Sequence, residues 1–212
     1  MGVTQIQAAD VKALRDATGA GMMDCKNALL ASDGDMDRAR TWLREKGLSR
    51  AASKAGRSTK EGLIESYVHG VGGAARVGVL VELNCESDFV ARTDTFRELA
   101  REIALQVAGT SPLYVHRDEV PKKLVDAELA IFTKQIEGRP PEVAEKILAG
   151  KLDSYYSSVC LLDQPYIREP KRKVRDLVSE AIAKVGENIT VNRFVRFQVG
   201  ETQEAGDEST DV

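Results

Sequence analysis

Residues 77–85 read Val-Gly-Val-Leu-Val-Glu-Leu-Asn-Cys, a run of mainly aliphatic side chains in which valine recurs. Such a run predicts a buried β-strand, because β-branched side chains fit a pleated surface that is covered. The alternating stretch 63–68 predicts a second strand, and the glycine-rich segment 69–76 predicts the turn of an antiparallel hairpin. These glycines do not predict a phosphate-binding loop, because a strand follows them instead of a helix.

The strand leads into Glu86-Ser87-Asp88-Phe89-Val90-Ala91-Arg92, which sets an acid beside a large aromatic ring where the chain turns toward solvent. Two interpretations are open. In the first, Asp88 caps the next helix and Phe89 folds back onto the core, which general residue preferences favour. In the second, both side chains act on a partner. A carboxylate can disturb a metal or phosphate site, and a phenyl ring can enter an apolar pocket.

Composition narrows the class of protein. The chain has 212 residues, 42% of them hydrophobic and 30% charged, which suits one or two domains with a hydrophobic core. The formal net charge of −3 argues against direct binding of nucleic acid. No apolar run approaches the roughly 20 residues that cross a bilayer, and the polar N-terminus does not resemble a secretory leader. We therefore expect a cytoplasmic protein that does not bind membranes.

The cysteines and histidines do not predict a metal site. The three cysteines, Cys25, Cys85 and Cys160, lack CxxC spacing and are typical of reduced, buried thiols. A disulfide that joins two chains through one of these cysteines is an alternative that the sequence leaves open. His69 and His116 lie far apart in the sequence, so we expect no bound metal and no cofactor.

Residues 1–48 predict a three-helix domain. Its helices are expected at about 8–17, 22–32 and 36–46. Asp35 is a good N-cap for the third helix, and Gly47 is expected to end it. Helices of this length are marginal alone, and the set resembles a ubiquitin-associated-type bundle.

The corner between the first two helices predicts a docking surface. Gly19 and Gly21 allow a tight turn there, and the turn presents Met22 and Met23, flexible side chains that adapt to a partner's groove. Arg15 lies on the same edge and could bond a partner's carbonyl groups. Ordinary helix packing is the alternative, more for Met23 than for Met22.

Residues 49–62 and 201–212 are expected to lie outside the packed cores. The first segment is small, polar and basic, which predicts a linker or a loosely helical arm. A solvated linker is favoured over a contact with an acidic partner or RNA. The second segment has acids and no base, which predicts a disordered tail.

Residues 63–200 predict an α+β core in which helices pack against one side of an antiparallel sheet. Helices are expected at about 94–108, 121–137, 142–157 and 172–185, with a helical hairpin over about 119–157. Gly109 is expected to close the first of them, and Gly150 to interrupt or end the third. Further strands are expected at 111–115, 159–162 and 189–199. The last strand is expected to bury one face that carries Ile189, Val191, Val195, Phe197 and Val199.

Three segments resemble the elongation factor Ts family, the guanine-nucleotide exchange factors of bacterial elongation factor Tu. The first covers residues 11–29, VKALRDATGAGMMDCKNAL. The second is Asp88-Phe89-Val90-Ala91, similar to the family's Thr-Asp-Phe-Val-Ala motif, with Ser87 in place of threonine and Arg92 where lysine is frequent. The third comprises residues 164–167, QPYI, and 195–201, VRFQVGE, which are similar to the family's closing segments. The segments occur in the family's order.

The resemblance implies nucleotide exchange without covalent chemistry. The implied partner is elongation factor Tu, both GDP-bound and nucleotide-free, and no direct binding of nucleotide is implied. Docking on its nucleotide-binding domain is assigned to Arg15, Gly19, Gly21, Met22 and Met23. Disturbance of its magnesium and phosphate site is assigned to Ser87, Asp88, Phe89 and Val90. The chain carries one hairpin and one Asp-Phe motif, like the family's short members, which implies a homodimer, for which an edge strand such as 189–199 is suited.

Two other functions are open on sequence grounds. A ubiquitin-associated-like adaptor would use the Gly-Met-Met corner for another partner, but would leave Asp88 and Phe89 without a role. An enzyme with a pocket at residues 70–73 lacks support, since no nucleophile–base pair, metal cluster or phosphate motif accompanies the glycines.

Overall fold

The computed structural model describes residues 6–72 and 74–201, so the predicted tail at 202–212 lies outside the described residues. The α-helices are α1 (Ala8–Thr18), α2 (Met22–Ala31), α3 (Met36–Ala52), α4 (Asp88–Ala91), α5 (Asp94–Thr110), α6 (Lys122–Gln135), α7 (Pro141–Val159) and α8 (Val174–Val185). The strands are β1 (Glu61–Val71), β2 (Ala74–Cys85), β3 (Pro165–Tyr166), β4 (Glu169–Lys173) and β5 (Ile189–Gln198). Two 3₁₀ turns are η1 (Arg117–Glu119) and η2 (Leu161–Asp163). Within these ranges, no helix has the length and apolar character that a membrane span requires.

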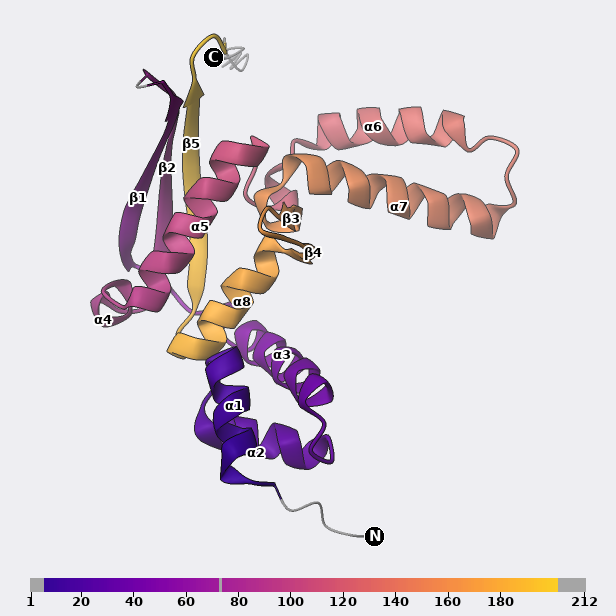
Figure 1. Cartoon of the computed structure of the whole chain (residues 1–212). Coiled ribbons are helices and arrows are strands. Elements are labelled where there is room, and N and C mark those ends of the chain that lie inside the picture. Colours follow the sequence, from indigo (N-terminus) through magenta and orange to yellow (C-terminus); the bar gives the residue numbers. More distant parts are fainter. Residues whose placement is uncertain (1–5, 73, 202–212) are drawn as a thin grey trace.

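A three-stranded antiparallel sheet in the order β1-β2-β5 forms the centre of the core. Helices α5 and α8 lie on one face of this sheet, and no helix of the described residues covers the opposite face (Figure 1). Val81 and Leu83 on the central strand are fully buried against Phe96 and Ile103 of α5. An N-terminal helical bundle followed by a sheet with helices on one side confirms the predicted α+β class.

Strand β5 departs from the predicted alternation because it contains a β-bulge. Glu82 pairs with Arg193 and Leu83 pairs with Val191, so Asn192 is an extra residue on β5. One inserted residue moves every later side chain to the other face of a sheet. Ile189 and Val191 are therefore buried as expected. The expectation that Val195, Phe197 and Val199 share their buried face was wrong: Phe197 and Val199 are exposed, and Phe194 takes the core position.

Helices α1–α3 pack into the predicted bundle around a small core of Leu14, Cys25, Ala28, Leu29 and Ala39. Asp35 caps α3 as expected, since its side chain accepts hydrogen bonds from the backbone N–H groups of Asp37 and Arg38. Gly47 does not end this helix, which continues to Ala52. Residue 47 instead faces α8, where a Cβ atom would lie 3.4 Å from that of Ala183, an ordinary van der Waals contact.

Two further glycines lie inside helices that they were expected to end. Gly109 lies within α5, which ends at Ser111 in the left-handed conformation. A Cβ atom at residue 109 would meet Ile167 Cδ1 at 2.8 Å, so a larger residue there would require the Ile167 side chain to shift. Gly150 lies within a continuous α7.

The strands expected at 111–115 and 159–162 are replaced by one parallel bridge between Tyr114 and Cys160, followed by the 3₁₀ turn η2. The short hairpin of β3 and β4 was not predicted, because it contains charged residues and no apolar alternation.

Helices α6 and α7 form the predicted hairpin, which projects away from the sheet (Figure 1). Its base is held by Asp163, a carboxylate that is 1% exposed. Asp163 accepts hydrogen bonds from Arg117, which lies between α5 and α6, and from Arg175 on α8. Lys173 is a third cation, 3.9 Å from the same oxygen. One buried acid thus joins the hairpin to the core.

Candidate functional site

The Asp88-Phe89 pair lies on a one-turn helix at one end of the sheet. Strand β2 ends in the buried Cys85, and Ser87 is the N-cap of α4, its Oγ accepting a hydrogen bond of 3.4 Å from the Val90 N–H. Thr93 then caps α5, so the chain reverses direction within a few residues. Such a tight turn directs the side chains at its outer surface into solvent.

Phe89 is 76% exposed, the largest exposed fraction among the large hydrophobic residues that the structure describes. Asp88 is exposed beside it and forms an ion pair of 2.7 Å with Arg92. The interpretation in which Asp88 caps the helix and Phe89 joins the core was wrong, because Ser87 occupies the cap and Val90 occupies the core position. Val90 is buried, so in this conformation it anchors the turn and does not face a partner.

Ser87 is held from the opposite side by Glu187. The Glu187 carboxylate accepts hydrogen bonds from the Ser87 backbone N–H at 3.0 Å and from the Ser87 hydroxyl at 2.7 Å. Burial raises the pKa of the Cys85 thiol, and the nearby Glu187 charge raises it further, which keeps the thiol protonated at neutral pH. Cys85 is therefore a structural residue beside the motif.

The second predicted surface is the corner between α1 and α2. Gly19 ends α1 with a φ of +67°, and Gly21 is the N-cap of α2. Met23 is 65% exposed and Met22 nearly half exposed, so neither side chain contributes to the small core of the bundle. Arg15 is exposed one turn before Gly19. All five predicted docking residues thus lie at or beside one exposed corner.

The base of this corner is fixed by ion pairs. Asp24, directly after the two methionines, accepts hydrogen bonds from Arg50 at 2.8 and 3.0 Å and from Lys46 at 3.1 Å. The bond from Arg50, together with that from Lys46, outweighs desolvation and lowers the pKa of the Asp24 carboxyl. The carboxylate therefore stays charged and joins the start of α2 to α3.

Both surfaces flank the C-terminal end of α8. A Cβ atom at Gly19 would lie 3.1 Å from Lys184 Cε, so the α1–α2 corner approaches α8 closely. The turn after α8 carries Glu187, which binds Ser87. Figure 1 shows α4 at the end of the sheet that is nearer to the bundle. The methionine corner and the Phe89 turn, the two predicted contact points for a partner, therefore both lie beside the same helix, α8.

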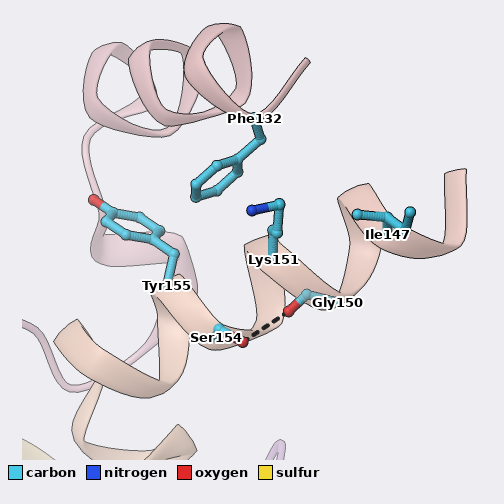
Figure 2. A pocket seen from close by; sticks show the side chains of 6 residues that line it. All are labelled: Phe132, Ile147, Gly150, Lys151, Ser154 and Tyr155. Atoms are coloured by element: carbon cyan, nitrogen blue, oxygen red, sulfur yellow. Dashed lines mark hydrogen bonds between the residues drawn. The ribbon is translucent and has the colours of Figure 1, made fainter. Parts of the chain in front are cut away.

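Three features of the described residues bear on the alternative of an enzyme. Those residues contain no group of three or more potential metal ligands. Strand β1 runs to Val71 and β2 begins at Ala74, so the connection is shorter than the predicted turn at 69–76, but a strand follows the glycines as predicted. One hollow lies between α6 and α7 and is lined by Phe132, Ile147, Gly150, Lys151, Ser154 and Tyr155 (Figure 2). In this hollow Lys151 donates a hydrogen bond to the Gln135 side chain. The Ser154 hydroxyl donates one to the Gly150 carbonyl (Figure 2).

Sequence reasoning located the exposed pair but missed the residues that hold it, Glu86, Glu187 and Asn188. Glu86 is separated in the sequence from Glu187 and Asn188 by about a hundred residues. Only the pairing of β2 with β5 brings the two segments together. The only local signal is an acid followed by asparagine after a helix-ending glycine, Gly186.

Comparison with known proteins gives one consistent answer. Residues 36–202 match the family model described as elongation factor TS. A protein named elongation factor Ts from Thermodesulfovibrio yellowstonii is 52% identical over 200 residues, covering 94% of this chain and 98% of the relative. Proteins of the same name from Moorella thermoacetica and Fervidobacterium nodosum are each 53% identical, covering 92% and 93% of this chain and 96% and 100% of their own lengths.

Proposed function

Because the chain belongs to the elongation factor Ts family, a family of translation elongation factors that act in nucleotide exchange, we propose that it releases GDP from elongation factor Tu by means of Asp88 and Phe89. The observation that carries the proposal is the exposure of Phe89 on a short turn whose neighbours are anchored. No substrate bond is made or broken, so the chain needs no catalytic acid, base or nucleophile. The proposal places it in the cytoplasm.

The mechanism has two parts. Arg15, Met22 and Met23 dock on the nucleotide-binding domain, where thioether side chains adapt to an apolar groove. Phe89 then enters a crevice behind the nucleotide site and shifts its walls, while Asp88 adds negative charge near the magnesium and phosphate groups. Ser87 and Val90 contribute by fixing the turn from which these two residues project.

The thermodynamics of exchange are reciprocal. If this chain weakens the binding of GDP by some factor, GDP weakens the binding of this chain by the same factor. A factor that stabilises the nucleotide-free state therefore speeds turnover and leaves when new nucleotide binds.

The test is the release of a fluorescent GDP analogue from elongation factor Tu, followed at increasing concentrations of this protein. We expect the rate of release to rise with the concentration of this protein until it saturates. Replacing Asp88 by alanine should lower that rate. No acceleration by the folded protein would reject the exchange function. A ubiquitin-associated-like adaptor would then be the better proposal. Its basis would be the resemblance of the N-terminal bundle to a ubiquitin-associated domain.

The docking corner makes a separate prediction. Replacing both Met22 and Met23 by alanine should raise the concentration of factor that gives half-maximal release by about tenfold, since two exposed interface side chains are lost. The maximal rate should change less than about twofold, because the Phe89 turn is untouched. Titration of the factor at fixed elongation factor Tu measures both quantities. An unchanged half-maximal concentration would show that the corner does not dock.

We further propose that the chain is a homodimer, and that the uncovered face of the sheet forms its interface. Ile64, Val68, Leu80 and Phe197 are exposed on this face, and Phe197 is 62% exposed. A flat apolar surface of this kind is typical of a contact between copies. The free edge of β5, suggested by the sequence, is the alternative route to the same pairing.

Replacing Phe197 by aspartate should convert the dimer to a monomer at micromolar concentration, because a charge would be buried without a partner. Light scattering after size-exclusion chromatography measures the mass. Leu113→Asp introduces the same charge at an exposed apolar position outside the sheet and should leave the mass unchanged. A Phe197→Asp protein that stays dimeric would favour the edge of β5.

A further inference from the structure

The turn that carries Phe89 is too short to fix its own orientation. Helix α4 has four residues, and one helical turn forms few internal hydrogen bonds, so it is not stable in isolation. Its cap bond from the Val90 N–H to Ser87 Oγ is long, at 3.4 Å. The orientation of Phe89 must therefore depend on contacts with the rest of the chain.

Two carboxylates hold this turn beyond the point where strand pairing stops. The ladder of β2 and β5 ends with Cys85 opposite Ile189. Beyond it, Glu187 accepts hydrogen bonds from the backbone N–H and hydroxyl of Ser87. Glu86 in turn accepts one from the Asn188 N–H at 2.6 Å. The segment after β2 thus supplies a carboxylate for a backbone N–H group before β5. The segment before β5 supplies one for a backbone N–H group after β2.

The same junction holds the linker that leads from the bundle. The buried Asn188 side chain donates hydrogen bonds to the carbonyl groups of Arg57, at 2.9 Å, and Ala55, at 3.4 Å. Arg57 forms an ion pair of 3.5 Å with Glu86. Lys54 donates a hydrogen bond to the Gly186 carbonyl. The segment expected to be a solvated linker is therefore bound to the α8–β5 turn.

We infer that Glu187 is a positioning residue that acts through Ser87 to orient Phe89, and that the Glu86–Asn188 pair joins this turn to residues 54–57, which lead from helix α3 of the bundle. The inference rests on the proposed exchange function. Binding of a partner at both the methionine corner and the Phe89 turn costs less conformational entropy when the separation of the two is fixed before binding. Glu187 touches neither the partner nor its nucleotide in this scheme, so it affects the rate only through the placement of the ring.

The expected effect is on the maximal rate and not on docking. Glu187→Ala should lower the maximal rate of GDP release by about tenfold, as expected when two hydrogen bonds to a charged acceptor are lost. The half-maximal concentration should change less than about twofold, because the methionine corner remains. Glu187→Gln should stay within about threefold of the parent, since its amide can accept from the Ser87 N–H and donate to the hydroxyl.

Glu102→Ala is the matched control. The Glu102 carboxylate also accepts two hydrogen bonds, from the Tyr166 hydroxyl at 2.6 Å and from Arg168 Nε at 2.7 Å, but it lies on α5 and does not contact α4 through them. Its loss should not lower the maximal rate. In a Phe89→Ala background, Glu187→Ala should have no further effect, because the residue through which it acts is already gone.

Amide hydrogen exchange gives a readout that is independent of elongation factor Tu. Glu187→Ala should speed exchange of the amides of residues 87–91 while those of β2 stay protected. If the parent protein does not release GDP, the proposed function fails, and the amide exchange still decides whether Glu187 holds the turn. If the parent is active and Glu187→Ala matches it in maximal rate, the positioning inference fails alone. An additive loss in the Phe89→Ala background would also overturn it.

Discussion

Replacing Phe89 by alanine is expected to lower the maximal rate of GDP release from elongation factor Tu by at least about 30-fold, the effect of losing an aromatic anchor that is buried only in the complex. Folding should be unaffected, because the ring is 76% exposed and contributes nothing to the core. Stopped-flow release of a fluorescent GDP analogue measures the rate, and the thermal midpoint measures folding. The half-maximal concentration should rise less than the maximal rate falls, since docking at the methionine corner remains.

Two further variants separate the insertion of the ring from a general loss of apolar surface. Leu113→Ala removes a similarly exposed side chain beyond the opposite end of α5, and it should release GDP at the parental rate. Phe89→Leu keeps part of the volume and should give an intermediate rate. A Phe89→Ala protein that retains the full maximal rate would show that the ring does not act on the nucleotide site.

The parts of the fold that follow from local pattern were predictable. The central hairpin, α5 and α8 each carry a clear period of apolar residues, and each lies where that period places it. The errors have tertiary causes. The bulge at Asn192 reverses the faces of half a strand. Its one sign in the sequence is Arg193, a charged residue on the face that the alternation expects to be apolar. Gly47 and Gly109 resemble helix ends in the sequence but lie inside α3 and α5, where they face Ala183 and Ile167.

The candidate site was likewise predictable only where it depends on local sequence. An acid beside an aromatic ring after a buried strand was visible in the sequence, but residue preferences favoured a capped helix and a buried ring. The structure reverses both assignments because Ser87 takes the cap and Val90 takes the core position. Glu187 could not be paired with Ser87 from sequence, since only the β2–β5 ladder brings the two together.

Replacing Asp163 by alanine is expected to lower the free energy of unfolding by about 2 kcal/mol, because it removes a buried carboxylate that accepts hydrogen bonds from two partly exposed arginines. Asp163 is 1% exposed and accepts hydrogen bonds from Arg117 and Arg175. The Arg117 guanidinium also lies 4.7 Å from the centre of the Tyr156 ring, and the Arg117 side chain is 38% exposed. The variant would leave these cations without their shared acceptor at the base of the α6–α7 hairpin.

Urea unfolding is the suitable measurement, because a neutral denaturant does not screen ion pairs, and all variants should be compared at one protein concentration. Asp153→Ala is the matched control, since Asp153 binds the same Arg117 but is about half exposed. Its loss should lower the free energy of unfolding by only about 0.5 kcal/mol, as is typical of exposed pairs. Asp163→Asn should fall between the two, since its amide oxygen accepts one of the bonds without the charge. Equal losses for Asp153 and Asp163 would mean that water replaces the buried acid, and that the hairpin is joined to the core by apolar packing instead.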